Sequence, residues 1–404
     1  MAEVFRSTSR GLTIASYLLA IALTQFFNYF FAPLLPLLAQ RYHVTLDTAA
    51  WTVLVFPLSS AVISGTAGAL GDRIGFFRSI QAGLAAIALF ALLRVYSGTI
   101  GLLIVCQLGI GLSVPFVLAP VSSFLAAHCN EKERDRFTGL CTVCLFAGIG
   151  LSFFIAPWLV QHVNYTGAMD TLAILAIAVF AFFTFSGAAG SSIAPDLTIP
   201  HSVPGFRILG NRNVVLLCLG GFLGQGCFNA IVTWIVAIWQ EHGLSPQAAG
   251  LATSIAIFSG IAGSLILPPA LDRFLGMRRG FFFCVLPAAC LVYPCLFPDS
   301  PLLGFVACAL IGFFQFPTLA MAFNLLARSV PIERTSSAVG IYWMTSNLGI
   351  FSISYTAGLI HHLAGWHAAA SSIFLCLACL LVTIPFLRDP QQGAPVSTTC
   401  NGAA

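Results

Sequence analysis

Apolar stretches long enough to cross a bilayer recur along this chain, and charged residues or clusters of Gly and Pro separate them. A spanning helix needs roughly 20 apolar residues, because the hydrocarbon core is about 30 Å thick and backbone hydrogen bonds must be made within it. The pattern predicts twelve spans, placed approximately at residues 11–39, 48–71, 77–96, 99–127, 137–162, 168–188, 213–240, 247–271, 280–297, 301–329, 335–362 and 366–388.

Composition and charge support this prediction. Of the 404 residues, 58% are hydrophobic and 7% are charged, which is more apolar than a soluble domain. One side of the predicted spans holds fifteen basic residues, namely Arg6, Arg10, Arg73, Arg78, Lys132, Arg134, Arg136, Arg207, Arg212, Arg273, Arg278, Arg279, Arg328, Arg334 and Arg388, and the other side holds Arg41 and Arg94. The positive-inside rule then predicts two cytoplasmic termini. We expect an integral protein of a bacterial inner (plasma) membrane with no nucleic-acid partner.

Short sequence features recur at an offset of about 200 residues. The paired positions are Gln25 and Gln225, Asp72-Arg73 and Asp272-Arg273, Glu133-Arg134 and Glu333-Arg334, and Pro115 and Pro317. They predict an all-α membrane protein of two six-helix bundles with pseudo-twofold symmetry: an N-terminal bundle at 1–188, a cytoplasmic linker at 189–212, and a C-terminal bundle with a short tail at 213–404. Duplicated chains of this kind are typical of secondary transporters that bind solute between the halves, near the bilayer midplane.

The stretch GALGDRIGFFR, residues 68–78, resembles the loop between the second and third spans in the major facilitator superfamily. Matching positions are Gly68, Asp72, Arg73 and Gly75, and the second copy keeps Asp272, Arg273, Gly276, Arg278 and Arg279. The two basic residues that the family usually places after the glycine are Phe76 and Phe77 here. The resemblance covers nearly the whole chain, and it implies the major facilitator fold with transport by alternating access.

Two further stretches resemble the cyanate-type permease branch of this superfamily: GLCTVCLFAGIGLSFFIAPWLVQH at residues 139–162 and FNAIVTWIVAIWQEHGLSPQAAG at residues 228–250. That branch carries an arginine near the start of its first span, which suits an anion. In this chain the first span has no charged residue after Arg10. The departure argues against an anionic substrate.

Uncharged polar side chains occupy the predicted mid-membrane positions. The candidate substrate-binding residues are Gln25, Asn28, Gln225, Asn229, Gln315, Tyr342, Trp343, Ser346 and Asn347. Spacings of three or four residues place paired members on one helix face. Carboxamides and aromatic rings around a midplane cavity favour a neutral or weakly charged solute with hydrogen-bonding groups. The alternative is that these side chains join helices through interhelical hydrogen bonds.

The two Asp-Arg loops are predicted gates at the cytoplasmic ends of the bundles. The gating residues are Asp72, Arg73, Arg78, Asp272, Arg273 and Arg278. A carboxylate there can pair with loop arginines or with a helix N-terminus, and such contacts would hold the inner ends together while the cavity faces outward. We expect an asymmetric gate, whose first-half contact rests on Asp72, Arg73 and Arg78. The alternative is that the arginines only set the topology.

These patterns predict a secondary transporter that moves a small organic solute and works as a monomer in the lipid bilayer. Every acidic residue lies near a predicted helix end or in a loop, so the midplane carboxylate that suits proton coupling is missing, and a coupling ion is left open. Uptake, export of drugs, metabolites or siderophores, and a channel or sensor on the same fold are the alternatives. The sequence has no catalytic constellation, metal cluster or Walker motif. We therefore expect no enzyme activity, no cofactor and no metal.

Overall fold

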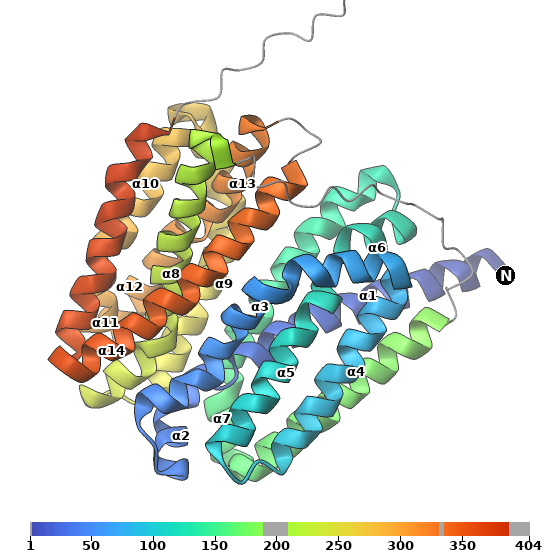
Figure 1. Ribbon diagram of the computed structural model, residues 1–404, viewed down its shortest axis with the longest axis horizontal. Helices are drawn as coiled ribbons and strands as arrows, with labels where there is room; N and C mark the ends of the chain where they lie inside the picture. Colours follow the sequence, from blue (N-terminus) through green and yellow to red (C-terminus); the bar gives the residue numbers. More distant parts are fainter. Residues whose placement is uncertain (1, 189–208, 331–334, 388–404) are drawn as a thin grey trace, which may run out of the picture.

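The computed structural model describes residues 2–188, 209–330 and 335–387, and in these ranges the chain is helical and has no β-strand. The first half contains α1 (Ala2–Tyr29), η1 (Ala32–Leu34), α2 (Leu35–Tyr42), α3 (Leu46–Ile74), α4 (Phe76–Val95), α5 (Ile100–Leu118), α6 (Val121–His128) and α7 (Glu131–Ala188). The second half contains α8 (Arg212–Glu241), α9 (Pro246–Leu275), α10 (Met277–Cys290), α11 (Val292–Leu296), α12 (Pro301–Gln315), α13 (Pro317–Ser329), α14 (Thr335–Thr383) and η4 (Ile384–Phe386). Figure 1 shows α1–α7 as one bundle beside a second bundle of α8–α14. Most of the predicted linker lies outside the described residues.

Nine stretches of the described chain are long and apolar enough to span a membrane. Two of them, Arg136–Ser186 with 51 residues and Ala338–Phe386 with 49 residues, are about twice the length that a bilayer requires. Each is divided at one residue with a left-handed backbone, Asn164 at φ 61° and Gly365 at φ 82°. α10 and α11 together make a further crossing. The prediction of twelve spans is thereby confirmed.

Prolines break three of the spans that the sequence predicts as continuous. The first span divides into α1, η1 and α2 around Pro33, the fourth divides into α5 and α6 at Pro120, and the tenth divides into α12 and α13 at Pro317. Proline has no N–H to donate, and its ring clashes with the preceding turn of a helix. Pro115, by contrast, stays inside α5.

The turns of the backbone repeat between the two halves. The residues with positive φ in the described chain form three pairs: His43 (53°) with Gly243 (79°), Gly75 (89°) with Gly276 (77°), and Asn164 (61°) with Gly365 (82°). Members of each pair are 200 or 201 residues apart. Positive φ is uncommon outside glycine, so the coincidence of all three pairs is strong support for a duplicated fold.

Close helix crossings repeat in the same way. A Cβ on Gly148 of α7 would lie 2.1 Å from the Ala22 carbonyl oxygen of α1, and a Cβ on Gly349 of α14 would lie 2.1 Å from the Phe222 carbonyl oxygen of α8. The second crossing is the first one moved along the chain by 200 or 201 residues. Because apolar side chains gain little by leaving lipid, such glycine-backed contacts are a main way to hold membrane helices together.

The largest contacts between the halves are those of α3 with α14 and of α7 with α9, and η1 and α2 of the first half also meet α8. Ser254 Oγ of α9 donates to the Gly150 carbonyl oxygen of α7 at 2.8 Å, and the Trp51 ring of α3 lies 5.6 Å from the Phe351 ring of α14. We call the end of the molecule with the turns at 43–45 and 243–245 the outer end, after the predicted topology, and the opposite end the inner end. The contacts between the halves run from the outer end to mid-depth.

Gly148→Val is expected to destabilise the protein, because the added methyl groups meet the Ala22 carbonyl and push α1 away from α7, at a cost of about 1–3 kcal/mol. The thermal unfolding midpoint of the purified protein measures the effect. Gly139→Val is the matched control in the same helix, since a Cβ on Gly139 meets nothing within 4 Å. An equal loss in both variants would contradict the role given to the crossing.

Candidate functional site between the two halves

A hydrogen bond joins the halves at residues that occupy equivalent positions in them. Tyr29 Oη, at the end of α1, donates to Asn229 Oδ1 of α8 at 2.5 Å. The two residues are 200 positions apart, and residues related by a twofold axis can touch only near that axis. Between parallel repeats the axis runs along the membrane normal. The Tyr29–Asn229 contact therefore lies close to the central line of the molecule.

Aromatic rings from both halves pack near this contact. The Tyr29 ring lies 6.3 Å from Phe153 of α7. The Phe228 ring, next to Asn229 in sequence, lies 5.0 Å from Phe316, and Phe316 lies 4.6 Å from Phe146 of α7. The Phe146–Phe316 pair is thus a second contact between the halves. The centre of the molecule combines apolar rings with a small number of hydrogen-bonding groups.

The predicted residues Gln25 and Gln225 lie one helical turn from Tyr29 and Asn229, toward the inner end. Residues four apart share a helix face, so both glutamines lie on the faces that meet the central line. Gln25 is buried and Gln225 is half-buried. Asn28 is also buried, and its Oδ1 has no hydrogen-bond partner in the described chain. The role of these residues in binding stays a prediction.

Three of the predicted residues in the second half donate to backbone, and one of them is Asn229, whose Nδ2 donates to the Gln225 carbonyl oxygen at 2.9 Å. Gln315 Nε2 of α12 donates to the Gly224 carbonyl oxygen of α8 at 3.0 Å. Asn347 Nδ2 donates to the Trp343 carbonyl oxygen in its own helix at 2.9 Å. The Gln315 bond joins two helices, as the helix-joining alternative expects, whereas the Asn347 bond stays within one helix. The other end of the Gln315 carboxamide, Oε1, is buried without a partner among the described residues.

Tyr342 and Ser346 of α14 pack against a glycine of α8. A Cβ on Gly221 would lie 2.4 Å from Ser346 Oγ and 2.7 Å from the Tyr342 ring. The Phe323 ring of α13 lies 5.3 Å from Tyr342 and 5.7 Å from Trp343. The structure therefore groups these residues within the second half, along the contact of α8 with α14.

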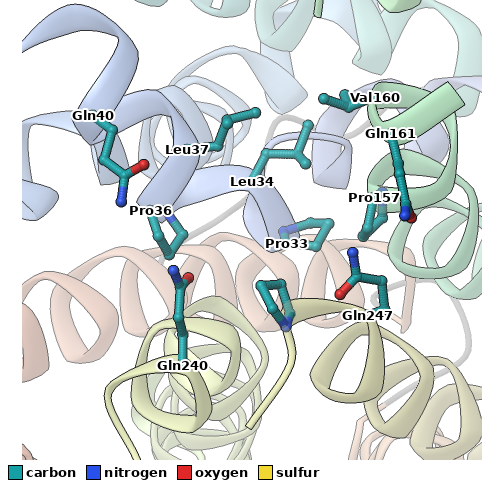
Figure 2. A pocket seen from close by; sticks show the side chains of 11 residues that line it. Pro33, Leu34, Pro36, Leu37, Gln40, Pro157, Val160, Gln161, Gln240 and Gln247 are labelled. Atoms are coloured by element: carbon teal, nitrogen blue, oxygen red, sulfur yellow. The ribbon is translucent and has the colours of Figure 1, made fainter. Parts of the chain in front are cut away.

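An outer pocket lies between the halves, and its lining residues are Pro33, Leu34, Pro36, Leu37, Gln40, Pro157, Val160, Gln161, Gln240, Pro246 and Gln247. Gln40 and Gln240 are 200 positions apart, so this pocket also lies close to the central line. Figure 2 shows the two carboxamides approaching from opposite sides, with Pro36 between them. The sequence analysis missed this pair, although the duplication register identifies it in the same way as Gln25 and Gln225.

At the inner end, the described contacts of the predicted gating residues lie within the second half. Asp272 Oδ2 pairs with Arg328 Nη2 at 2.9 Å, and Arg278 Nη1 donates to the Leu387 carbonyl oxygen at 3.1 Å. Arg273 is exposed. In the first half, Arg78 is exposed, and the side chains of Asp72 and Arg73 lie outside the described part of the structure.

A different ion pair holds the inner end of the first half. Arg10 of α1 pairs with Glu133 at the start of α7, and Arg10 Nε donates to the His128 carbonyl oxygen. The hydrogen bond from Arg10 holds the pKa of Glu133 below its usual value. The pair is therefore complete at neutral pH and weakens as the pH falls through that lowered pKa. The sequence analysis treated Arg10 only as a topology signal.

Arg94 is a buried cation. Its position near the end of a predicted span did not indicate this burial. The side chain is 1% exposed. Arg94 Nη1 donates to Gln107 Oε1 at 2.9 Å, and the guanidinium carbon lies 4.7 Å from the centre of the Phe27 ring. Phe27 is on the face of α1 opposite Gln25 and Tyr29, because residues two apart in a helix point in nearly opposite directions. The Arg94 charge therefore lies behind α1, away from the central line.

A family model of the Major Facilitator Superfamily matches residues 17–242 and 217–399. The chain belongs to this superfamily. It is a membrane transporter and not an enzyme, and its class carries small molecules by secondary transport.

Individual relatives are more distant. An uncharacterized protein of Archaeoglobus fulgidus is 30% identical over 220 residues, which cover 54% of this chain and 96% of that protein. The cyanate transport protein CynX of Escherichia coli is 28% identical over 254 residues, covering 61% of this chain and 63% of CynX, so less than two thirds of CynX is matched. The crystal structure of a mutant of the nucleoside transporter NupG is similar at a TM-score of 0.76, covers 94% of this chain and 100% of that one, and is 12% identical. That likeness shows a common fold.

Tyr29→Phe is expected to weaken the contact between the halves. Loss of the hydroxyl leaves the buried Asn229 oxygen without its donor, which costs about 1–3 kcal/mol, and the thermal unfolding midpoint should fall. Tyr96→Phe is the control, because Tyr96 is 73% exposed. If Tyr96→Phe lowered the midpoint as much as Tyr29→Phe, the central hydrogen bond would have no special weight.

Proposed function

We propose that this transporter moves a small, neutral or weakly charged organic solute with hydrogen-bonding groups, and that the solute passes along the central line between the halves. The observation that carries the proposal is the Tyr29–Asn229 hydrogen bond. It joins equivalent residues of the two halves, so rocking of the halves must form and break it. We call this arrangement outer-closed, because this bond joins the halves on the outer side of Gln25 and Gln225 and would block the line there.

The order of polar groups along this line suggests a path. The outer pocket, with Gln40 and Gln240, comes first; the Tyr29–Asn229 contact follows; Gln25 and Gln225 come next toward the inner end. Carboxamides both donate and accept hydrogen bonds, and the pairs repeat across the pseudo-twofold axis. A solute with donors and acceptors can therefore exchange water for carboxamides on either side of the block.

A neutral substrate is supported by where the charges lie. The described contacts on the central line come from Tyr, Asn, Gln and Phe side chains, while the buried Arg94 faces the opposite side of α1. An anion in a low-dielectric cavity needs a cation or several donors to replace its hydration. CynX is named for cyanate transport, and an anion of that kind finds no cation among the described contacts of the central line in this chain.

A ligand screen with carboxamide variants tests the site. Purified protein is screened by thermal shift against neutral solutes with hydrogen-bonding groups, and a hit is then followed by counterflow in proteoliposomes. Gln25→Ala and Gln225→Ala are expected to reduce the shift produced by a hit, since each removes hydrogen bonds worth about 0.5–1.5 kcal/mol.

The control for this screen is Gln81→Ala. Gln81 Nε2 donates to Thr184 Oγ1 at 3.3 Å within the first half, away from the contact between the halves. A hit that stabilised Gln25→Ala and Gln225→Ala as strongly as the parent would show that the site is wrong. Flux without saturation or counterflow would favour a channel.

We also propose that the Asp-Arg loops gate the inner end. In the outer-closed arrangement, Asp272 is paired with Arg328 inside its own half, so closure of the inner end requires it to exchange or supplement this partner. Asp72→Asn is expected to lower the rate of counterflow strongly while leaving expression and the unfolding midpoint unchanged. Asp299→Asn, at an exposed turn of the outer end, is the control. If Asp72→Asn showed counterflow at the parent rate, the proposed gating role of Asp72 would be wrong.

A further inference from the structure

One half-buried carboxylate lies where the halves meet, and one of its oxygens is covered. We define the outer seam as the contact of α3 with α8 and α14 around a small cavity lined by Asp47, Ala50, Leu54, Trp234, Tyr355 and Leu359. Asp47 Oδ1 lies 2.8 Å from the place where a Cβ on Gly358 would be, with the Trp234 ring beside it. This oxygen is buried, and no described residue donates a hydrogen bond to it. The seam therefore closes directly over a carboxylate oxygen.

An imidazole lies on the opposite side of the seam, one turn of α14 beyond Gly358. The His361 ring stacks on Trp366 with centroids 3.6 Å apart and an interplanar angle of 13°. Trp366 Nε1 in turn donates to Glu241 Oε2 of α8 at 2.5 Å. His361 Nδ1 is buried and lacks a hydrogen-bond partner within the described ranges. The stack fixes the imidazole plane while one ring nitrogen stays unsatisfied.

The titratable groups around this seam come from α3, α8 and α14. Asp47 interacts electrostatically with His361 and His362. His361 interacts with Asp47, Glu241 and His362. Two carboxylates and two imidazoles therefore share one end of the contact between the halves, and the number of bound protons sets their net charge.

Closing the seam changes the cost of each protonation state. An ionised carboxylate without a donor is expensive to bury, whereas a proton on the carboxyl group, or on the imidazole facing it, lowers that cost. Asp47 and His361 interact electrostatically, so a proton on one group changes the cost of protonating the other. When the seam opens, both return to water, where near pH 7 an aspartate is ionised and a histidine is mostly neutral. Near pH 7 the closed seam thus binds a proton more readily than the open seam.

We propose that Asp47 and His361 form a proton-binding site that controls the outer seam: the pair takes up a proton as the seam closes and releases it to the outer solution as the seam opens. Acid therefore favours the outer-closed arrangement, and the site makes outward opening sensitive to external pH. The inference goes beyond the proposed function, because it does not depend on which solute is carried.

Accessibility of a thiol in the seam tests the proposal on the full chain in lipid nanodiscs. Ala50 is fully buried and lines the cavity, so Ala50→Cys reports opening through its reaction with a water-soluble maleimide, measured on its own peptide by mass spectrometry. Thr166→Cys, exposed at the outer end, corrects for the intrinsic pH dependence of the reagent. The corrected rate is expected to fall on acidification from pH 7.5 to 6.5, by up to about tenfold per pH unit.

Variants decide whether this pair is responsible. Asp47→Asn in the Ala50→Cys chain is expected to abolish the pH slope, whereas Asp170→Asn, at an exposed position, should keep it. His361→Gln serves as a second variant, and it should change the slope around pH 6.5, where the histidine of the pair titrates in water. A flat profile in the parent, or the parent slope in both Asp47→Asn and His361→Gln, overturns the proposal. The assay contains no solute, so a failed ligand screen leaves this result unaffected.

Discussion

Glycine at the contact between the halves is the constraint on which the rest of the structure depends. A Cβ on Gly250 of α9 would lie 2.6 Å from the Phe153 carbonyl oxygen of α7, and one on Gly358 of α14 would lie 2.8 Å from Asp47 Oδ1 of α3. Both positions let backbone or polar atoms of the other half come close, and the glycine itself has no side chain to interlock with them. Interlocking costs dispersion energy to undo, so a seam built on glycine can close tightly and still separate, as alternating access requires.

Because the chain is duplicated, equivalent polar residues of the two halves meet along the central line of the molecule. Tyr29 with Asn229 and Gln40 with Gln240 are equivalent pairs that share a contact or a pocket, which is possible only near the pseudo-twofold axis. The pairs are not identical in every case, and the difference is useful. A tyrosine opposite an asparagine gives one donor and one acceptor, whereas two identical side chains at an axis would have to share those roles.

The sequence predicted the fold well. Hydropathy and the placement of arginines indicate the membrane spans, and the duplicated residues indicate the two halves. The sequence analysis named Asn229 as a candidate binding residue through its spacing from Gln225, and that role stays a prediction. It missed Tyr29, since a tyrosine near a helix end is an ordinary interfacial residue in a membrane protein. It also treated Asp47 as an ordinary helix-end carboxylate. Gly358 and Trp234, which cover one oxygen of Asp47, are about 190–310 residues away in sequence. Hydropathy along the chain does not indicate contacts between residues so far apart.

The inner ends show how two copies of one fold diverge. Arg328, which pairs with Asp272 in the second half, corresponds to His128 in the first. Burial lowers the pKa of His128 below its usual value, so near neutral pH this position carries no cation for Asp72. The first half holds its inner end through Arg10 and Glu133 instead. The asymmetry expected from Phe76 and Phe77 therefore extends to the position equivalent to Arg328. Because the two inner ends are fixed by different ion pairs, they have different free energies of release, and rocking of the halves need not load both loops equally.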